Sequence, residues 1–183
     1  MNESEMKAFC IELMRKTLVG YLTTINEDGI PYTRALYNLR NKEQFPTLTK
    51  IFRNHNKDLL VYFSTNTSSS KVKHIRKNPI VAVYFCRAEP KDFRGVMLSG
   101  EIEIVTDQKI KEDLWLDWWE LYYPKGVTDE DYTILRLLPD FVEIYFKLRK
   151  LTLALTRDKT AFNGAQKMPE VLHNYSGSFW KVM

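Results

Sequence analysis

Apolar and polar positions near the N-terminus alternate with the period of a helix. The apolar residues recur at spacings of three and four: Met6, Phe9, Cys10, Leu13 and Met14. This spacing places them on one helical face, and Asn2 followed three residues later by Glu5 has the form of an N-terminal capping box. The pattern predicts a first helix over about residues 3–17.

From residue 18 onward the helical period gives way to short runs rich in β-branched and aromatic residues. These runs predict strands over residues 18–25, 32–39, 58–65, 80–88 and 94–105, and two or three more between residues 134 and 155. Asp28-Gly29 is typical of a hairpin turn between the first two strands. One longer helix is expected across residues 108–123, between the capping residue Asp107 and Pro124.

Many short strands with tight connections and few helices are typical of a small antiparallel barrel or sandwich. We therefore predict a mainly β fold with a few helices (α+β), built on six to eight antiparallel strands. At 183 residues the chain suits one well-cored domain rather than two. We place this domain at residues 1–155, because glycine, proline and polar residues dominate from residue 156 onward and indicate loops. We expect this tail, residues 156–183, to pack on the same domain.

Composition and charge favour some classes of ligand over others. Lys and Arg number 27 and Asp and Glu 23, and the net charge of +4 suits an anionic small ligand but is too mild to indicate nucleic acid. Cys10 and Cys86 lie in apolar surroundings and are expected to be free thiols in a reducing compartment. The chain opens without a signal-peptide pattern, and no apolar run approaches the ~20 residues of a membrane helix. We expect a cytoplasmic protein with no membrane partner.

The segment with the most distinctive chemistry is STNTSSSKVKHIRKNP, residues 64–79. A flexible linker is disfavoured because two strongly apolar strands flank the segment. A nucleic-acid patch is disfavoured because Val72 and Ile75 give the basic run an apolar stripe, as a solvated helix would have. The third interpretation is a strand end, a turn of capping residues and a helix start, which would present free N–H groups, serine hydroxyls and Lys71 to an anion.

Arg34 supports this third interpretation. It lies within a predicted strand that is expected to be largely buried, on the same face as Tyr32 and Leu36. A buried cation needs an anionic partner, which is either an acidic side chain of the protein or a ligand. Arg34 and Lys71 together would form a two-sided clamp for a phosphate.

Three stretches resemble the flavin-binding split-barrel family related to pyridoxamine phosphate oxidase, in its general-stress-protein branch. They are GYLTTINEDGIPYTRAL, YFSTNTSSSKVKHIRKNPIVAVYF and GVMLSGEIEIV, and their order, with five residues between Thr65 and Lys71, carries the resemblance. The similarity covers about residues 5–146. It implies a split β-barrel homodimer that holds FMN at the subunit interface.

The resemblance also implies roles for particular residues. Arg34 and Lys71 would be the cationic ligands of the FMN phosphate, and Ser64, Thr65, Ser69 and Ser70 would donate hydrogen bonds around it. The backbone of Ala35 and Leu36 would meet the edge of the flavin ring.

Two features of true pyridoxamine phosphate oxidases are missing from the chain. Where that family has a glutamine close to the flavin, the chain reads FRGVM, and the tail has His173 but no arginine two residues before it. We therefore expect a flavin-dependent oxidoreductase with a different, unknown substrate. The alternatives are a flavin-binding stress or sensing protein without turnover, the same fold with a deazaflavin or heme, and a basic interaction module without cofactor.

No other catalytic or metal-binding pattern stands out. The three histidines, His55, His74 and His173, have no cysteine or carboxylate at the spacing of metal ligands. No residue can be named as a nucleophile, general acid or general base. If chemistry occurs, the cofactor supplies it and the protein contributes position and electrostatics.

Overall fold

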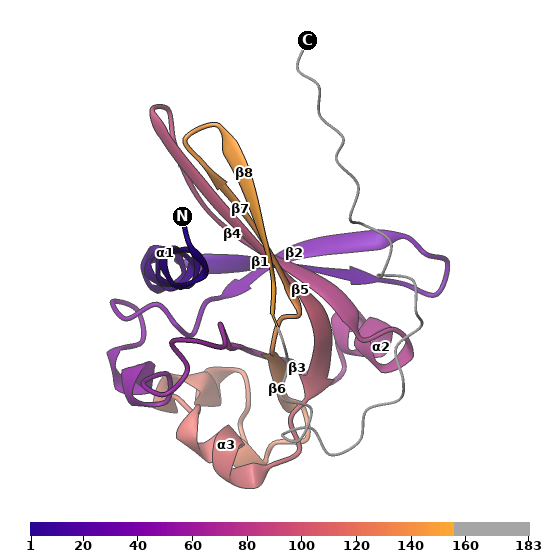
Figure 1. The fold of residues 1–183 in the computed structure, drawn as a ribbon. Helices are drawn as coiled ribbons and strands as arrows, with labels where there is room; N and C mark the ends of the chain where they lie inside the picture. The colour runs from indigo at the N-terminus through magenta and orange to yellow at the C-terminus, as the bar shows by residue number, and fades with distance from the viewer. Residues whose placement is uncertain (156–183) are drawn as a thin grey trace.

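The N-terminal helix α1 (Glu3–Lys16) begins at the predicted capping box. The Asn2 side chain accepts a hydrogen bond from the Glu5 backbone, and the Glu5 carboxylate accepts one from the backbone N–H of Asn2. The apolar face of α1 buries Cys10, Ile11, Leu13 and Met14 against the sheet. The computed structural model describes residues 1–155 (Figure 1), so the predicted packing of the tail lies outside the described residues.

Eight strands form one antiparallel sheet (Figure 1), as the sequence predicts. They are β1 (Val19–Ile25), β2 (Pro31–Tyr37), β3 (Val61–Asn66), β4 (Ile80–Glu89), β5 (Asp92–Ile104), β6 (Tyr132–Leu137), β7 (Phe141–Phe146) and β8 (Arg149–Ala154). The order is β2-β1-β4-β5-β6-β3, and β7 pairs with β5 and β8. The fold is mostly antiparallel β with a few helices, in a curled half-barrel sheet that fits a split barrel.

The long strand β5 splits the sheet because it changes partner along its length. Its first part, up to Ser99, pairs with β7, and its last part, Ile102 to Ile104, pairs with β6. The sheet therefore diverges in two directions from β5, with β7 and β8 on one side and β6 and β3 on the other (Figure 1). The end strands β2 and β3 come close together without pairing, which curls the sheet toward closure.

The predicted helix over residues 108–123 is wrong, because the structure breaks it into two pieces. These are α3 (Gln108–Asp113) and the 3₁₀ helix η2 (Asp117–Leu121), with Leu116 extended between them. Tryptophan, tyrosine and aspartate are weak helix formers, so tertiary packing decides the conformation here. Trp115 and Trp119 both pack on the ring of Tyr132.

Those aromatic residues belong to a second, smaller core. This core also includes residues of two 3₁₀ helices, η1 (Pro46–Lys50) and η3 (Gly126–Thr128). Its buried members are Leu39, Phe45, Leu48, Phe52, Leu60, Tyr62, Val105, Leu114, Trp119, Tyr123, Tyr132 and Ile134. The segment over residues 40–57 is therefore packed on one side of the barrel.

Strand β2 is more exposed than predicted. It is the outer strand of the sheet path, and most of its side chains reach solvent, although Arg34 and Leu36 are partly buried. The exposure follows from the position of β2 at the end of the sheet. One edge of the strand has no neighbouring strand in the described part of the chain, and one face is hardly covered, so side chains there reach solvent. The expectation of a largely buried strand is wrong, but the expected common face of Tyr32, Arg34 and Leu36 follows from the strand's alternation.

The helix α2 (Ser70–Lys77) packs on β1, next to β2 (Figure 1). Its buried residues, Val72 and Ile75, are those that the apolar stripe marks in the sequence. Within residues 1–155, no helix is long and apolar enough to cross a membrane.

Candidate functional site

The turn from β3 into α2 has the form that the serine-rich segment predicts. Ser69 is the N-cap of α2, but its side chain makes no capping hydrogen bond, and its Oγ is buried without a hydrogen-bond partner. Asp131 anchors the turn by accepting hydrogen bonds from the Ser68 backbone at 2.7 Å and the Asn66 side chain at 2.6 Å. In the first turn of α2 the Val72 N–H donates to the Ser69 carbonyl at 3.1 Å, whereas the N–H groups of Ser70 and Lys71 have no intrahelical acceptor and are available to an anion.

Lys71, in the first turn of α2, points back to the end of β3. Its Nζ donates a hydrogen bond to Thr65 Oγ1 at 2.7 Å, and Thr65 is itself buried beside Thr133 of β6. Burial lowers the pKa of Lys71, and the positive charge of Arg34 lowers it further, while Asp131 acts in the opposite direction. Arg34 and Lys71 are therefore close enough to repel each other.

Arg34 reaches across the β1–β2 hairpin on the face that carries α2. Its Nη1 donates a hydrogen bond to Thr24 Oγ1 at 2.6 Å. In the strand register Arg34 lies opposite Leu22, so Thr24 is its diagonal neighbour on the same face. Burial lowers the pKa of Arg34.

Neither cation is neutralised by a carboxylate within the part of the chain that the structure describes. Arg34 and Lys71 form no ion pair there within 4.0 Å. Asp131 is the acid whose charge reaches Lys71, yet its two oxygens accept bonds from Ser68 and Asn66. Two partly buried, mutually repelling cations without a neutralising partner favour an anionic ligand.

Of the remaining predicted site residues, two lie beside Lys71 and three lie elsewhere. Ser69 and Ser70 lie at the start of α2 next to Lys71, as predicted. Ser64 lies beside Tyr123, where it partly offsets the rise in the Tyr123 pKa that burial causes. Ala35 is exposed on the face of β2 opposite Arg34, and Leu36 packs against the main core.

Two residues of this cluster were missed by the sequence analysis. Thr24 is fully buried and contacts Arg34, and His74 Nδ1 lies 3.0 Å from Thr24 Oγ1. No usable signal for Thr24 existed in the sequence, because a two-residue turn at Asp28-Gly29 would pair Arg34 with Thr23. The structure instead pairs Arg34 with Leu22 and so places Thr24 diagonally from it. His74 could not be found either, since its contact depends on how α2 packs on β1.

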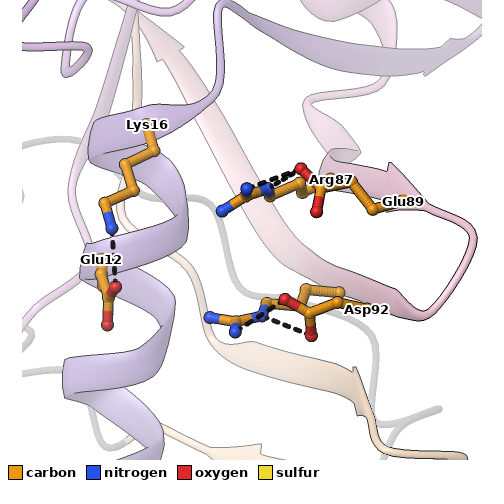
Figure 2. A network of polar contacts seen from close by, with 6 residues as sticks. Glu12, Lys16, Arg87, Glu89 and Asp92 are labelled. Atoms are coloured by element: carbon orange, nitrogen blue, oxygen red, sulfur yellow. Dashed lines mark hydrogen bonds and ion pairs between the residues drawn. The ribbon is translucent and has the colours of Figure 1, made fainter.

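A second group of cations lines a cavity of about 340 Å³ between α1 and the β4–β5 hairpin. Each cation there has a carboxylate partner nearby in sequence, and Figure 2 shows Lys16 with Glu12 and Arg87 with Glu89. Lys16 pairs with Glu12 at 2.9 Å, Arg87 with Glu89 at 2.6 Å, and Arg94 with Asp92 at 2.8 Å. This cavity has no uncompensated positive charge, so it is a poorer candidate for an anion site than the Arg34–Lys71 cluster.

Among residues 1–155, no group of three or more histidine, cysteine, aspartate or glutamate side chains could hold a metal ion. The candidate chemistry of the described chain is therefore the binding of an anion by Arg34, Lys71 and the start of α2.

The split β-barrel with a cationic strand-to-helix turn defines the class of protein, and the comparisons with known proteins agree with it. The family described as pyridoxamine 5'-phosphate oxidase like matches residues 50–167. The chain belongs to this family. None of the curated proteins compared with the chain is significantly similar to it.

Solved structures support the same assignment. A Clostridium acetobutylicum protein related to general stress protein 26 of B. subtilis, of the pyridoxinephosphate oxidase family, is 30% identical over 85% of this chain and 97% of its own, with a TM-score of 0.66. General Stress Protein 26 from Bacillus anthracis shares the fold at 19% identity, over 81% of this chain and 99% of its own, with a TM-score of 0.60. A heme binding protein from Mycobacterium smegmatis shares the fold at 15% identity, over 84% and 58%, with a TM-score of 0.59.

Proposed function

We propose that the protein is an FMN-binding flavoprotein and a flavin-dependent oxidoreductase. The observation that carries the proposal is the pair Arg34 and Lys71, two partly buried cations whose charges reach each other and which form no ion pair within 4.0 Å among residues 1–155. A phosphate monoester between them would relieve their repulsion and accept charge-assisted hydrogen bonds from both. The N-terminal turn of α2, with Ser69 and Ser70, would contribute further donors to the same phosphate.

The flavin ring would lie along β2, against the backbone of Ala35 and Leu36. As the outer strand of the sheet path, β2 has backbone groups that face away from β1 and pair with no described strand. Bound FMN supplies hydride or electron transfer. The chain would bind the phosphate and orient the ring, and its own residues do not provide an evident acid or base.

The homodimer expected from the family resemblance is supported by the outer face of the sheet. Directly paired residues share a face, and one such row carries Ala35, Tyr21, Tyr84, Met97 and Glu143. All five are at least partly exposed, and Tyr21 retains 39% of its surface. Tyr21, Tyr84 and Met97 make the middle of this row apolar, and an exposed apolar sheet face is typical of a protein–protein interface. A second copy on this face would also cover Ala35.

The dimer can be tested with Tyr21→Arg, which places a charge in the middle of the row. The expected result is dissociation, measured by sedimentation equilibrium. Tyr122→Arg is the matched control, because Tyr122 is an exposed tyrosine (62%) on the edge of η2 rather than on the sheet. A dimer that survives Tyr21→Arg, or a monomeric parent protein, would contradict the proposed interface.

FMN binding is tested by titration of the purified protein, followed by quenching of flavin fluorescence. Arg34→Ala and Lys71→Ala should each weaken FMN binding about tenfold to a hundredfold, because a charge-assisted hydrogen bond is lost. Lys73→Ala, an exposed change on the same helix, is the control and should leave the affinity unchanged. Unaltered affinity in both site variants would exclude the clamp.

Turnover is a separate question from binding. NAD(P)H oxidation by the FMN-loaded protein, with and without candidate electron acceptors, distinguishes an enzyme from a passive flavin-binding stress or sensing protein. The absorption spectrum distinguishes FMN from heme or a deazaflavin, whose propionate or phosphate groups would meet the same cations. A Soret band in place of the flavin bands would favour the heme alternative.

A further inference from the structure

Thr24, His74 and Arg34 form a hydrogen-bonded chain that links three elements. Arg34 Nη1 on β2 lies 2.6 Å from Thr24 Oγ1 on β1, and Thr24 Oγ1 lies 3.0 Å from His74 Nδ1 on α2. The ring of His74 also packs on Tyr32, with centroids 5.3 Å apart. Because Thr24 is fully buried, its hydroxyl has to be satisfied by these neighbours.

The chemistry of the three groups sets the direction of the hydrogen bonds. A guanidinium can only donate, so the Thr24 oxygen accepts from Arg34. The single hydroxyl proton of Thr24 then needs an acceptor, and His74 Nδ1 is the one within reach. We assign the Nε2–H tautomer to His74 from this network, so that Nδ1 accepts from Thr24. The chain therefore runs from Arg34 through Thr24 to His74.

We propose that Thr24 and His74 are positioning residues for the phosphate-binding arginine. The inference rests on the proposed function. Arg34 lies near the like charge of Lys71, which opposes its position on this face. Thr24 holds the guanidinium in place, and His74 holds the Thr24 hydroxyl so that its oxygen faces Arg34. Neither partner carries a negative charge, so the arginine is oriented without being neutralised.

This arrangement pre-organises the site. A ligand that meets an already oriented cation does not have to order it on binding, which raises the affinity. Lys71 is tethered in the same way by Thr65, at 2.7 Å. Both cations are thus held by threonine hydroxyls, but the tether of Arg34 includes a third residue, on the same helix as Lys71.

The test compares FMN and riboflavin binding by fluorescence titration. Thr24→Val keeps the shape of the side chain and removes the hydroxyl, and it should weaken FMN binding about tenfold. Riboflavin, which has no phosphate, should bind the variant and the parent equally. Thr24→Ser restores a hydroxyl and should restore most of the affinity.

The same logic applies to His74. His74→Leu removes the acceptor and should weaken FMN binding, whereas His74→Asn keeps an acceptor near the position of Nδ1 and should retain it. Thr17→Val, a buried threonine in the separate Asn38 network, is the matched control and should not change the affinity. Thermal unfolding confirms that each variant is folded.

A double-mutant cycle separates positioning from general structural damage. In an Arg34→Ala background, Thr24→Val should have no further effect on FMN affinity, because there is no arginine left to orient. If the parent protein binds FMN and Thr24→Val is without effect, or if its effect persists in full without Arg34, the positioning role is excluded while the proposed function stands. If the parent protein does not bind FMN, the proposed function fails and this role fails with it.

Discussion

Two groups of cations in the same molecule are held in opposite ways. Arg87 and Arg94, beside α1, are each paired with a carboxylate two residues away on the β4–β5 hairpin (Figure 2). Arg34 and Lys71 are instead held by the hydroxyls of Thr24 and Thr65. A carboxylate fixes a cation and cancels its charge, whereas a hydroxyl fixes it and leaves the charge available. The difference separates an arginine that supports structure from one that is ready for a ligand.

Of the substitutions at the two groups of cations, placing a carboxylate next to Lys71 should change FMN affinity most. Thr65→Asp would convert its tether into an ion pair and set a negative charge against the incoming phosphate. We expect FMN affinity to fall about a hundredfold or more, since both the pairing and the repulsion oppose binding. Fluorescence titration measures the change, with Thr65→Ser as the control that keeps a hydroxyl. Equal affinities for the two variants would show that the neutral tether is unimportant.

The pH dependence of binding offers a second, smaller test. Burial and the charge of Arg34 lower the pKa of Lys71 from its ordinary value of 10.5. FMN affinity should therefore be fully present at lower pH and be lost as pH rises through this depressed value, because deprotonated Lys71 no longer attracts the phosphate. Titrations across an alkaline pH series measure the loss, which should amount to about tenfold.

The Arg34→Ala variant provides the control for that pH series. Removing the neighbouring charge should move the loss of affinity to higher pH, toward the ordinary lysine value. A loss at the same pH in both proteins would contradict the coupling between the two cations.

Removing a carboxylate from the paired group should have the smallest effect. Asp92→Asn frees Arg94 from its ion pair, but both side chains are partly open to solvent. We expect unchanged FMN affinity and a shift in unfolding temperature of no more than about 4 °C, because exposed ion pairs contribute little. Calorimetry and fluorescence titration measure the two quantities. An appreciable gain or loss of FMN affinity would mean that the two groups are not independent.

The two regions also differ in how far they could be predicted. Lys71 was predicted from a strand end, a capping run and a cation in the first helical turn, which are local features, whereas Arg34 was predicted from a strand expected to be buried and Thr65 from the family resemblance. In the structure Lys71 donates a hydrogen bond to Thr65 and lies within reach of the charge of Arg34. The paired arginines on β4 and β5 were not predicted as a group, because Arg87 and Arg94 come together only in the register of the hairpin, where they face each other.

The structure departs most from the prediction at residues 108–123, where one continuous helix was expected. Their apolar spacing is helical, yet the second core separates them into α3 and η2 around the extended Leu116. Aromatic side chains gain more from burial against Tyr132 than a weakly favoured helix gains from continuity. The exposure of β2 was misjudged for a related reason, since an apolar strand is buried only if another element covers it.

By itself the sequence determined the helix α1 with its capping box, the first hairpin, a fold of six to eight antiparallel strands and the cationic turn before α2. Each depends on residues that are close together in the chain, whose spacing or capping chemistry is readable directly. Only the tertiary structure decided that β5 splits the sheet, that β2 remains open, and that Thr24 and His74 meet Arg34. These features depend on register and on the packing of α2 against β1, which bring together side chains that no local pattern connects.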